Sequence, residues 1–194
     1  MTAIETPAAG MTSLPAAGTT RPLVVGLDLS LTSTGIAGEG WTDHIRTKTR
    51  GDHRLNYLAG EVSSFIKAAD LVVMEGPSYG HAALAGHEDL AGLRTLVRQF
   101  CFRRRIPYAV IPPATLKLYG TGNGRAAKGE VRSAVADRYG IHTEGAARYD
   151  EADAYVAMAA GMQWLGYPLA AVPERQARAL AGVAWPPQTP AVAA

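Results

Sequence analysis

Short apolar runs alternate with longer segments of helical periodicity through the middle of the chain. Strand-like runs lie at residues 23–29, 35–38, 41–48, 71–74 and 108–111. Residues 71–74 are apolar throughout, which is typical of a central strand buried on both faces. The Pro112-Pro113 pair ends the last run, because proline cannot continue a sheet ladder. The pattern therefore predicts five strands.

Apolar residues recur every three or four positions in four other segments, which predicts helices. These segments span residues 54–68, 88–104, 128–139 and 150–165. Helices alternate with the later strands, which indicates parallel strands joined by right-handed crossovers, whereas the first three strands are close enough to pair as antiparallel hairpins. We therefore predict an α/β fold with a five-stranded mixed sheet flanked by helices.

Composition divides the 194 residues into one folded domain and two tails. Residues 1–20 are rich in Ala, Thr, Gly and Pro and predict a flexible leader, and 171–194 predict a loosely held C-terminal tail with a short helix near 174–180. The domain is then 21–170. Cys101 is the single cysteine, so no disulfide forms within the chain. There is no secretory signal and no apolar run long enough to span a membrane, so we expect a cytoplasmic protein of a bacterial cell.

The small net charge of +2 conceals an asymmetry along the chain. Between Arg94 and Arg138 there are ten basic residues against two acidic ones, so this segment carries +8 and the remainder carries −6. Such a division suits a protein that binds a polyanion with one part and holds cations with another. Solvated helix faces are the alternative explanation, and charge alone does not separate the two.

Four carboxylates occupy unusual positions in this pattern. Asp28 lies within an apolar strand, and Glu75 directly follows the central strand, where sites built on sheets commonly lie. Asp150 and Asp153 are three residues apart, on one face of a helix, whereas Glu151 between them should point elsewhere. Each has an ordinary structural explanation: a turn cap for Asp28, a loop acid for Glu75, and first-turn acids for the pair.

Together the four carboxylates indicate a metal site at one edge of the sheet. Clustered carboxylates repel each other and need cations, and oxygen ligands without cysteine favour Mg²⁺ or Mn²⁺ over Zn²⁺. Two such ions about 3.5–4 Å apart form the clamp used in phosphodiester hydrolysis, which leaves a 5′-phosphate and a 3′-hydroxyl.

At these positions the sequence resembles the RuvC-type Holliday junction resolvases, within the ribonuclease H-like nucleases. The resemblance covers residues 22–165. It is carried by four stretches in order: Val25-Gly26-Leu27-Asp28 with Thr34-Gly35-Ile36-Ala37, Val72-Val73-Met74-Glu75, the Gly-rich basic stretch from Pro113 to Lys128, and Asp150-Glu151-Ala152-Asp153-Ala154. The resemblance implies a ribonuclease H-like fold and a Mg²⁺-dependent endonuclease that cuts four-way junctions by paired symmetric nicks.

The resemblance also implies roles for single residues. Asp28, Glu75, Asp150 and Asp153 would hold two Mg²⁺ ions, for which Mn²⁺ can substitute, and Lys128 would join them in catalysis. The remaining implied DNA contacts are Lys117, Lys128, Arg125, Tyr79, Gly122 and Gly124. The glycines would let the backbone approach a phosphate, although a flexible connector has the same composition. Family members act as homodimers, and residues 88–104 resemble the helix that forms the dimer. An ordinary core helix is the alternative for this segment, and the two are compatible.

Two departures from the family pattern affect the expected specificity. Leu29-Ser30 stands where the family has Pro-Gly, and Tyr79 is offset by one position from the aromatic residue that contacts unstacked bases. These departures indicate a phage-type member, and such members cut a wider range of branched DNA.

Two further interpretations remain open on the sequence. Gly26-x-Asp28 followed by Ser and Thr also resembles the phosphate loop of actin-like ATPases and sugar kinases, although 194 residues leave no room for the two domain copies that those proteins need. A catalytically inactive DNA-binding scaffold is the other alternative. Nucleotide hydrolysis without cutting would indicate a kinase relative, and binding without cutting would indicate a scaffold.

Overall fold

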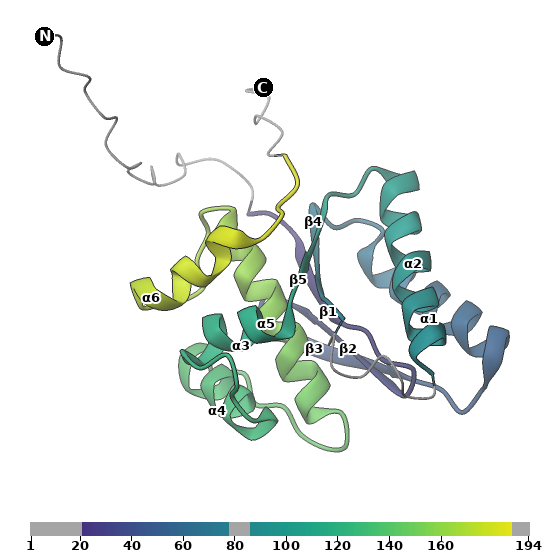
Figure 1. The fold of residues 1–194 in the computed structure, drawn as a ribbon, viewed down its shortest axis with the longest axis horizontal. Helices are drawn as coiled ribbons and strands as arrows, with labels where there is room; N and C mark the ends of the chain where they lie inside the picture. Colours follow the sequence, from purple (N-terminus) through teal and green to yellow (C-terminus); the bar gives the residue numbers. More distant parts are fainter. Residues whose placement is uncertain (1–20, 78–85, 188–194) are drawn as a thin grey trace, which may run out of the picture.

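A single five-stranded sheet organises the chain in the computed structural model, which describes residues 21–77 and 86–187 (Figure 1). The strands are β1 Val24–Asp28, β2 Ser33–Gly38, β3 Trp41–Arg46, β4 Leu71–Glu75 and β5 Tyr108–Ile111. Their order is β3-β2-β1-β4-β5. The first three strands pair antiparallel, and β1, β4 and β5 run parallel. The predicted five-stranded mixed sheet is confirmed.

Helices cover both faces of this sheet (Figure 1). On one face, α1 Gly51–Ile66 and α2 His87–Arg104 pack against the side chains of Val25, Leu27, Val72 and Met74. On the other face, α5 Arg148–Trp164 packs against Val24, Leu71 and Val73, and α3 Pro113–Thr121 and α4 Lys128–Tyr139 lie over α5. Successive strand residues alternate between the two cores, as the period of two requires.

The central helix α5 is buried along most of its length, from Glu151 to Met162. It approaches the sheet closely because β1 has a glycine beneath it. A Cβ atom at Gly26 would collide with the backbone of Ala154 and Met158. Glycine in a strand interior is often the mark of such a close backbone approach.

Residues 113–121 form a helix, although the sequence indicates only a basic loop before the helix that begins at Lys128. Pro113 is the first residue of α3, a position where the missing N–H is not needed and the fixed φ favours the helix. The proline pair therefore ends β5 and also starts α3. The predicted glycine-rich turn begins only at Gly122, after the end of α3, because Gly120 lies within the helix.

The segment after residue 170 packs more closely than the expectation of a loosely held tail. The predicted short helix is confirmed as α6 Glu174–Ala177, followed by the 3₁₀ turn η1 Arg178–Gly182. Leu180 is buried, and the Trp185 ring stacks on Trp164 with 4.8 Å between ring centroids. Composition alone did not indicate this packing. The apolar contacts of Leu180 and Trp185, the latter with Trp164, are enough to anchor a short segment to the domain.

Some expectations fall on residues that the structure does not describe. The leader over 1–20, the end of the tail over 188–194 and the proposed base-contacting residue Tyr79 all lie outside the described residues. Within the described ranges, none of the helices combines the length and the apolar composition that crossing a bilayer demands.

Candidate active site

The parallel pairing of β1 and β4 brings two acidic residues to the same edge of the sheet. Leu27 is in register with Met74, so Asp28 and Glu75, the next residue of each strand, end their strands side by side. Both side chains are partly buried. Two carboxylates at adjacent strand ends interact strongly in a site that is shielded from water.

The N-terminal turn of α5 adds the second pair of acids to this edge. Gly35 of β2 is paired with Asp28, and the backbone of Asp150 lies directly on Gly35. A Cβ atom at position 35 would collide with the carbonyl group of Asp150. Asp153 follows one turn later and is buried. Gly35 therefore determines how closely α5 approaches Asp28.

Gly35 positions α5 in the candidate site, a role that sequence reasoning did not identify. Gly35 belongs to the stretch Thr34-Gly35-Ile36-Ala37 that carries the family resemblance, but there it counted only as a residue of a strand. The available signal was a glycine inside a strand, which often marks a close approach by another backbone. Its partner in that approach, α5, is distant in sequence and cannot be read from the strand itself.

The charges of the acids act on one another. Burial, followed by the charges of Glu75, Asp153 and Asp150, raises the pKa of Asp28 well above its usual value. Burial and the charge of Asp153 raise the pKa of Glu75 to about 7, against the opposing effect of nearby cations. Burial also raises the pKa of Asp153 to about 6. All four expected carboxylates therefore belong to one electrostatic cluster.

Two lysines neutralise part of this negative charge. Lys128 begins α4, and its Nζ lies 3.5 Å from Oδ1 of Asp150. Burial alone would lower the pKa of Lys128, but Asp150, Asp28 and Asp153 raise it above the usual value. Lys117, on α3, opposes the raised pKa values of Glu75 and Asp153. Both lysines therefore face the carboxylate cluster from the α3–α4 side of the sheet.

The connection from α3 to α4 carries three more of the expected DNA contacts, Gly122, Gly124 and Arg125. Gly122 ends α3 with φ 84°, a left-handed conformation that favours glycine. Gly124 lies against α3, where a Cβ atom would be 3.1 Å from the carbonyl oxygen of Ala114. The Arg125 side chain is exposed, and its backbone N–H donates to Oδ1 of Asn123.

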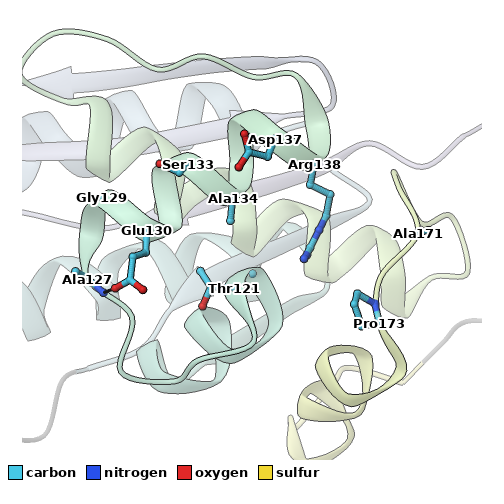
Figure 2. A pocket seen from close by; sticks show the side chains of 11 residues that line it. Thr121, Ala127, Gly129, Glu130, Ser133, Ala134, Asp137, Arg138, Ala171 and Pro173 are labelled. Carbon is cyan, nitrogen blue, oxygen red and sulfur yellow. Dashed lines mark hydrogen bonds between the residues drawn. The ribbon is translucent and has the colours of Figure 1, made fainter.

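A hollow beside this connection does not coincide with the carboxylate cluster. It has a volume of about 950 Å³ and lies between α3, α4 and the segment before α6 (Figure 2). In Figure 2 the Glu130 carboxylate folds back to the start of α4, where it accepts the N–H of Ala127 at 2.6 Å. None of the lining residues is Asp28, Glu75, Asp150 or Asp153.

Arg94 is a third cation near the acids, and sequence reasoning counted it only as part of the basic segment. It lies on α2, on the sheet face opposite to Lys117 and Lys128. The charges of Asp28 and Glu75 act on its guanidinium, and its own charge opposes the raised pKa of Glu75. The available signal was helical spacing, since residues 90, 94, 97 and 101 share one face of α2.

Glu151 points away from the cluster, as its position between the two aspartates predicts. It is buried against the edge strand β3, where its carboxylate accepts a hydrogen bond from Oγ1 of Thr42 at 3.0 Å. Its other oxygen lies 2.7 Å from Nδ1 of His44. These contacts fasten the first turn of α5 to β3, and thereby hold the helix that carries Asp150 and Asp153.

The donor chemistry of the cluster fits a hard divalent cation. The four carboxylates supply oxygen ligands only. Burial and repulsion by neighbouring acids raise the pKa values of Asp28, Glu75 and Asp153, and a bound cation would lower them. Within residues 21–77 and 86–187, no three His, Cys, Asp or Glu side chains are arranged as a ready-made metal site.

Comparisons with known proteins identify the fold. The structure is similar to that of Thermus thermophilus RuvC, with a TM-score of 0.58 and 21% sequence identity over 78% of this chain and 99% of that chain. It is also similar to T. thermophilus RuvC in complex with a Holliday junction substrate, with a TM-score of 0.61 and 20% identity over the same shares. The chain has the fold of RuvC.

Sequence comparisons add nothing to this structural likeness. No family model matches the chain, and no curated protein matches it in sequence. The RuvC-type, ribonuclease H-like fold expected from the sequence motifs is confirmed, but neither structural match supports the phage-type origin that the departures from the family pattern indicate.

Proposed function

We propose that this protein is a Mg²⁺-dependent endonuclease that resolves Holliday junctions by paired symmetric nicks. The observation that carries the proposal is the electrostatic cluster of Asp28, Glu75, Asp150 and Asp153 on a RuvC fold. The structural relative that was solved with a Holliday junction supports this class of substrate. A branched DNA also suits the net charge of +8 between Arg94 and Arg138.

In this proposal the four carboxylates hold two Mg²⁺ ions, and Mn²⁺ can replace them. Such ions supply water activation at neutral pH and stabilisation of the charge on the leaving oxygen. The raised pKa values of Asp28, Glu75 and Asp153 indicate acids whose charge is incompletely compensated by the protein alone. Ligands of this kind bind cations with a gain in stability.

The reaction is hydrolysis of one phosphodiester bond in each of two strands. A water oxygen forms a bond to phosphorus, the bond from phosphorus to the 3′-oxygen breaks, and that oxygen takes up a proton. The products are a 5′-phosphate and a 3′-hydroxyl, so the nicks are ligatable. Lys128, next to Asp150, and Lys117 bind and orient the phosphate backbone, and Arg125, Gly122 and Gly124 form the adjacent part of the DNA contact.

Paired nicks require two sites, and we propose a homodimer that forms through α2. This helix exposes Phe102, at 79% of its surface, and Leu96, at 39%. The two side chains are six positions apart on the helix and project in directions about 120° apart, so we take the more exposed Phe102 as the centre of the proposed interface. The basic end of the same helix, from Arg103 to Arg105, lies beside Phe102.

The decisive experiment is cleavage of a synthetic four-way junction, labelled on each strand in turn, with and without Mg²⁺. Denaturing gels are expected to show cuts at symmetric positions in two opposed strands, only with the metal, and ligase should reseal them. Asp28→Asn is expected to abolish cutting while it retains binding in EDTA, because it removes a metal ligand and leaves the cations in place. Asp137→Asn, which neutralises an exposed acid on α4, is the matched control.

The same experiment separates the alternatives. Cutting by Asp28→Asn at the wild-type rate would contradict the site. Equal cutting of flaps, three-way and four-way junctions would indicate a broader branched-DNA nuclease. Binding without cutting would indicate a scaffold, and nucleotide hydrolysis without cutting would indicate a relative of the actin-like kinases.

A further inference from the structure

Arg94 stands out because a charged residue occupies the inward stripe of α2. Leu93, Val97 and Cys101 on the same helix are fully buried in the core between α2 and the sheet. Arg94 is half-buried among them, one turn before Val97 and one turn after Leu90. Arginine is rarely placed in such a stripe unless its charge and its N–H groups have a partner.

The acids of the cluster are near Arg94 but do not pair with it. The charges of Asp28 and Glu75 raise the pKa of the Arg94 guanidinium, while burial lowers it and has the larger effect. Neither acid lies within 4.0 Å of the guanidinium as an ion pair. The Nε atom of Arg94 is buried and has no hydrogen-bond acceptor among the described residues.

An unpaired buried donor is costly, and a ligand can remove that cost. A buried N–H without an acceptor costs about 1–3 kcal/mol, more when the group is charged. The planar guanidinium fits two oxygens of a carboxylate or of a phosphate. Neither nearby carboxylate forms an ion pair with Arg94. The side chain is only half-buried, so its accessible part can donate to a DNA phosphate oxygen, which is the acceptor that suits a nuclease site.

We propose that Arg94 binds a backbone phosphate of the cleaved strand on the α2 side of the site. This inference rests on the proposed nuclease function. The helices α3 and α4, which carry Lys117 and Lys128, and the helix α2, which carries Arg94, lie on opposite faces of the sheet (Figure 1). The charges of all three residues act on Glu75, so the carboxylates are approached from both faces. The strand that crosses the sheet edge is thus held on both sides of the scissile phosphate. Single-sided contacts would leave the strand free to pivot.

The test measures junction binding in the Asp28→Asn background, in which cutting does not interfere. Arg94→Gln is expected to weaken binding about tenfold, and to reduce the slope of log K against log salt concentration by about 0.9, the value for one phosphate. Arg21→Gln makes the same charge change at the opposite edge of the sheet, where Arg21 precedes β1 and pairs with Glu39 at 2.9 Å. That control is expected to leave both quantities unchanged.

Neutral phosphates locate the contact. Junctions are prepared with one methylphosphonate at each position flanking the cut. A methylphosphonate at one position on one side of the cut is expected to weaken junction binding by the protein with Arg94 intact. The same methylphosphonate is expected to cause no further loss of binding in Arg94→Gln. A position on the other side is expected to show the same relation with Lys128→Ala. Finding both partners on the same side, or none for Arg94, would overturn the inference.

Two further variants keep the test decisive. Arg94→Lys retains the charge and is expected to retain the salt slope while it loses part of the affinity, so it replaces Arg94→Gln if that variant does not fold. Unchanged binding and slope on Arg94→Gln, together with a raised Mg²⁺ requirement for cutting when Arg94→Gln is introduced into the chain with Asp28 intact, would assign Arg94 to the positioning of Glu75 and overturn the phosphate contact. Failure of the wild-type chain to bind or cut junctions would instead refute the proposed function.

Discussion

Replacing Glu75 with glutamine is expected to stabilise the metal-free protein at neutral and alkaline pH. Burial and the charge of Asp153 raise the pKa of Glu75 from 4.5 to about 7, so the fold holds a proton on this group that the unfolded chain releases. Between pH 4.5 and 7 the folded state binds more protons than the unfolded state. The free energy of unfolding therefore falls as the pH rises through this window.

The magnitude follows from the pKa values. A difference of one in pKa corresponds to about 1.4 kcal/mol, so full ionisation of Glu75 costs the folded state on the order of 3 kcal/mol. Glutamine has nearly the same shape and no charge, and its introduction also removes one of the charges that raise the pKa of Asp28. We expect Glu75→Gln to raise the free energy of unfolding by about 1–3 kcal/mol at pH 8 and to leave it almost unchanged at pH 4.5.

Urea unfolding in EDTA, followed from pH 4.5 to 8, measures this difference directly. Glu144→Gln, which neutralises an exposed glutamate in the loop before α5, serves as the control and should change little at any pH. The comparison in EDTA matters because bound Mg²⁺ would favour the charged form of Glu75. A Glu75→Gln variant that is no more stable than the wild type at pH 8 would refute the assignment of an uncompensated buried carboxylate.

Three other outcomes are expected. Gly35→Ala should lower the free energy of unfolding by about 1–3 kcal/mol and strongly reduce junction cutting, because the new Cβ displaces Asp150. Gly129→Ala, where α4 has open space, is the control and should leave stability unchanged or raise it. Equal cutting by both variants would disprove this role of Gly35. Mg²⁺ should raise the melting temperature of the wild type by mass action, and much less that of Asp153→Asn, as calorimetry can establish. Phe102→Glu should yield a monomer in sedimentation experiments and uncouple the two nicks; an intact dimer would exclude Phe102 from the interface.

The acids of the cluster could be selected from the sequence because each breaks a local rule. Asp28 lies in a strand that is otherwise apolar, and Asp150 and Asp153 keep the spacing that places two side chains on one helix face. Glu75 ends a strand, which is an ordinary position, and it gained meaning only in combination with the others. Their expected roles as metal ligands, and the DNA contacts, stay predictions that the experiments above address.

Arg94, Gly35 and α3 show where local patterns were insufficient. Arg94 was one of ten basic residues, and its relation to Asp28 and Glu75 depends on how α2 packs on the sheet. Gly35 matters because α5, more than a hundred residues later, lies directly on it. The helix α3 was missed because a proline pair that ends a strand can also begin a helix, and only packing against α5 decides between a loop and a helix.

The sequence alone determined the five strands, four of the helices and their order, since strand and helix periods are local properties that the burial of each face imposes on neighbouring residues. Only the tertiary structure decided which residues meet. The register that places Asp28 beside Glu75, the approach of α5 over Gly35 and the position of Arg94 opposite the two lysines all arise from packing between distant segments. A one-residue shift in strand register would reverse every side chain across the sheet, and nothing within a single strand prevents it.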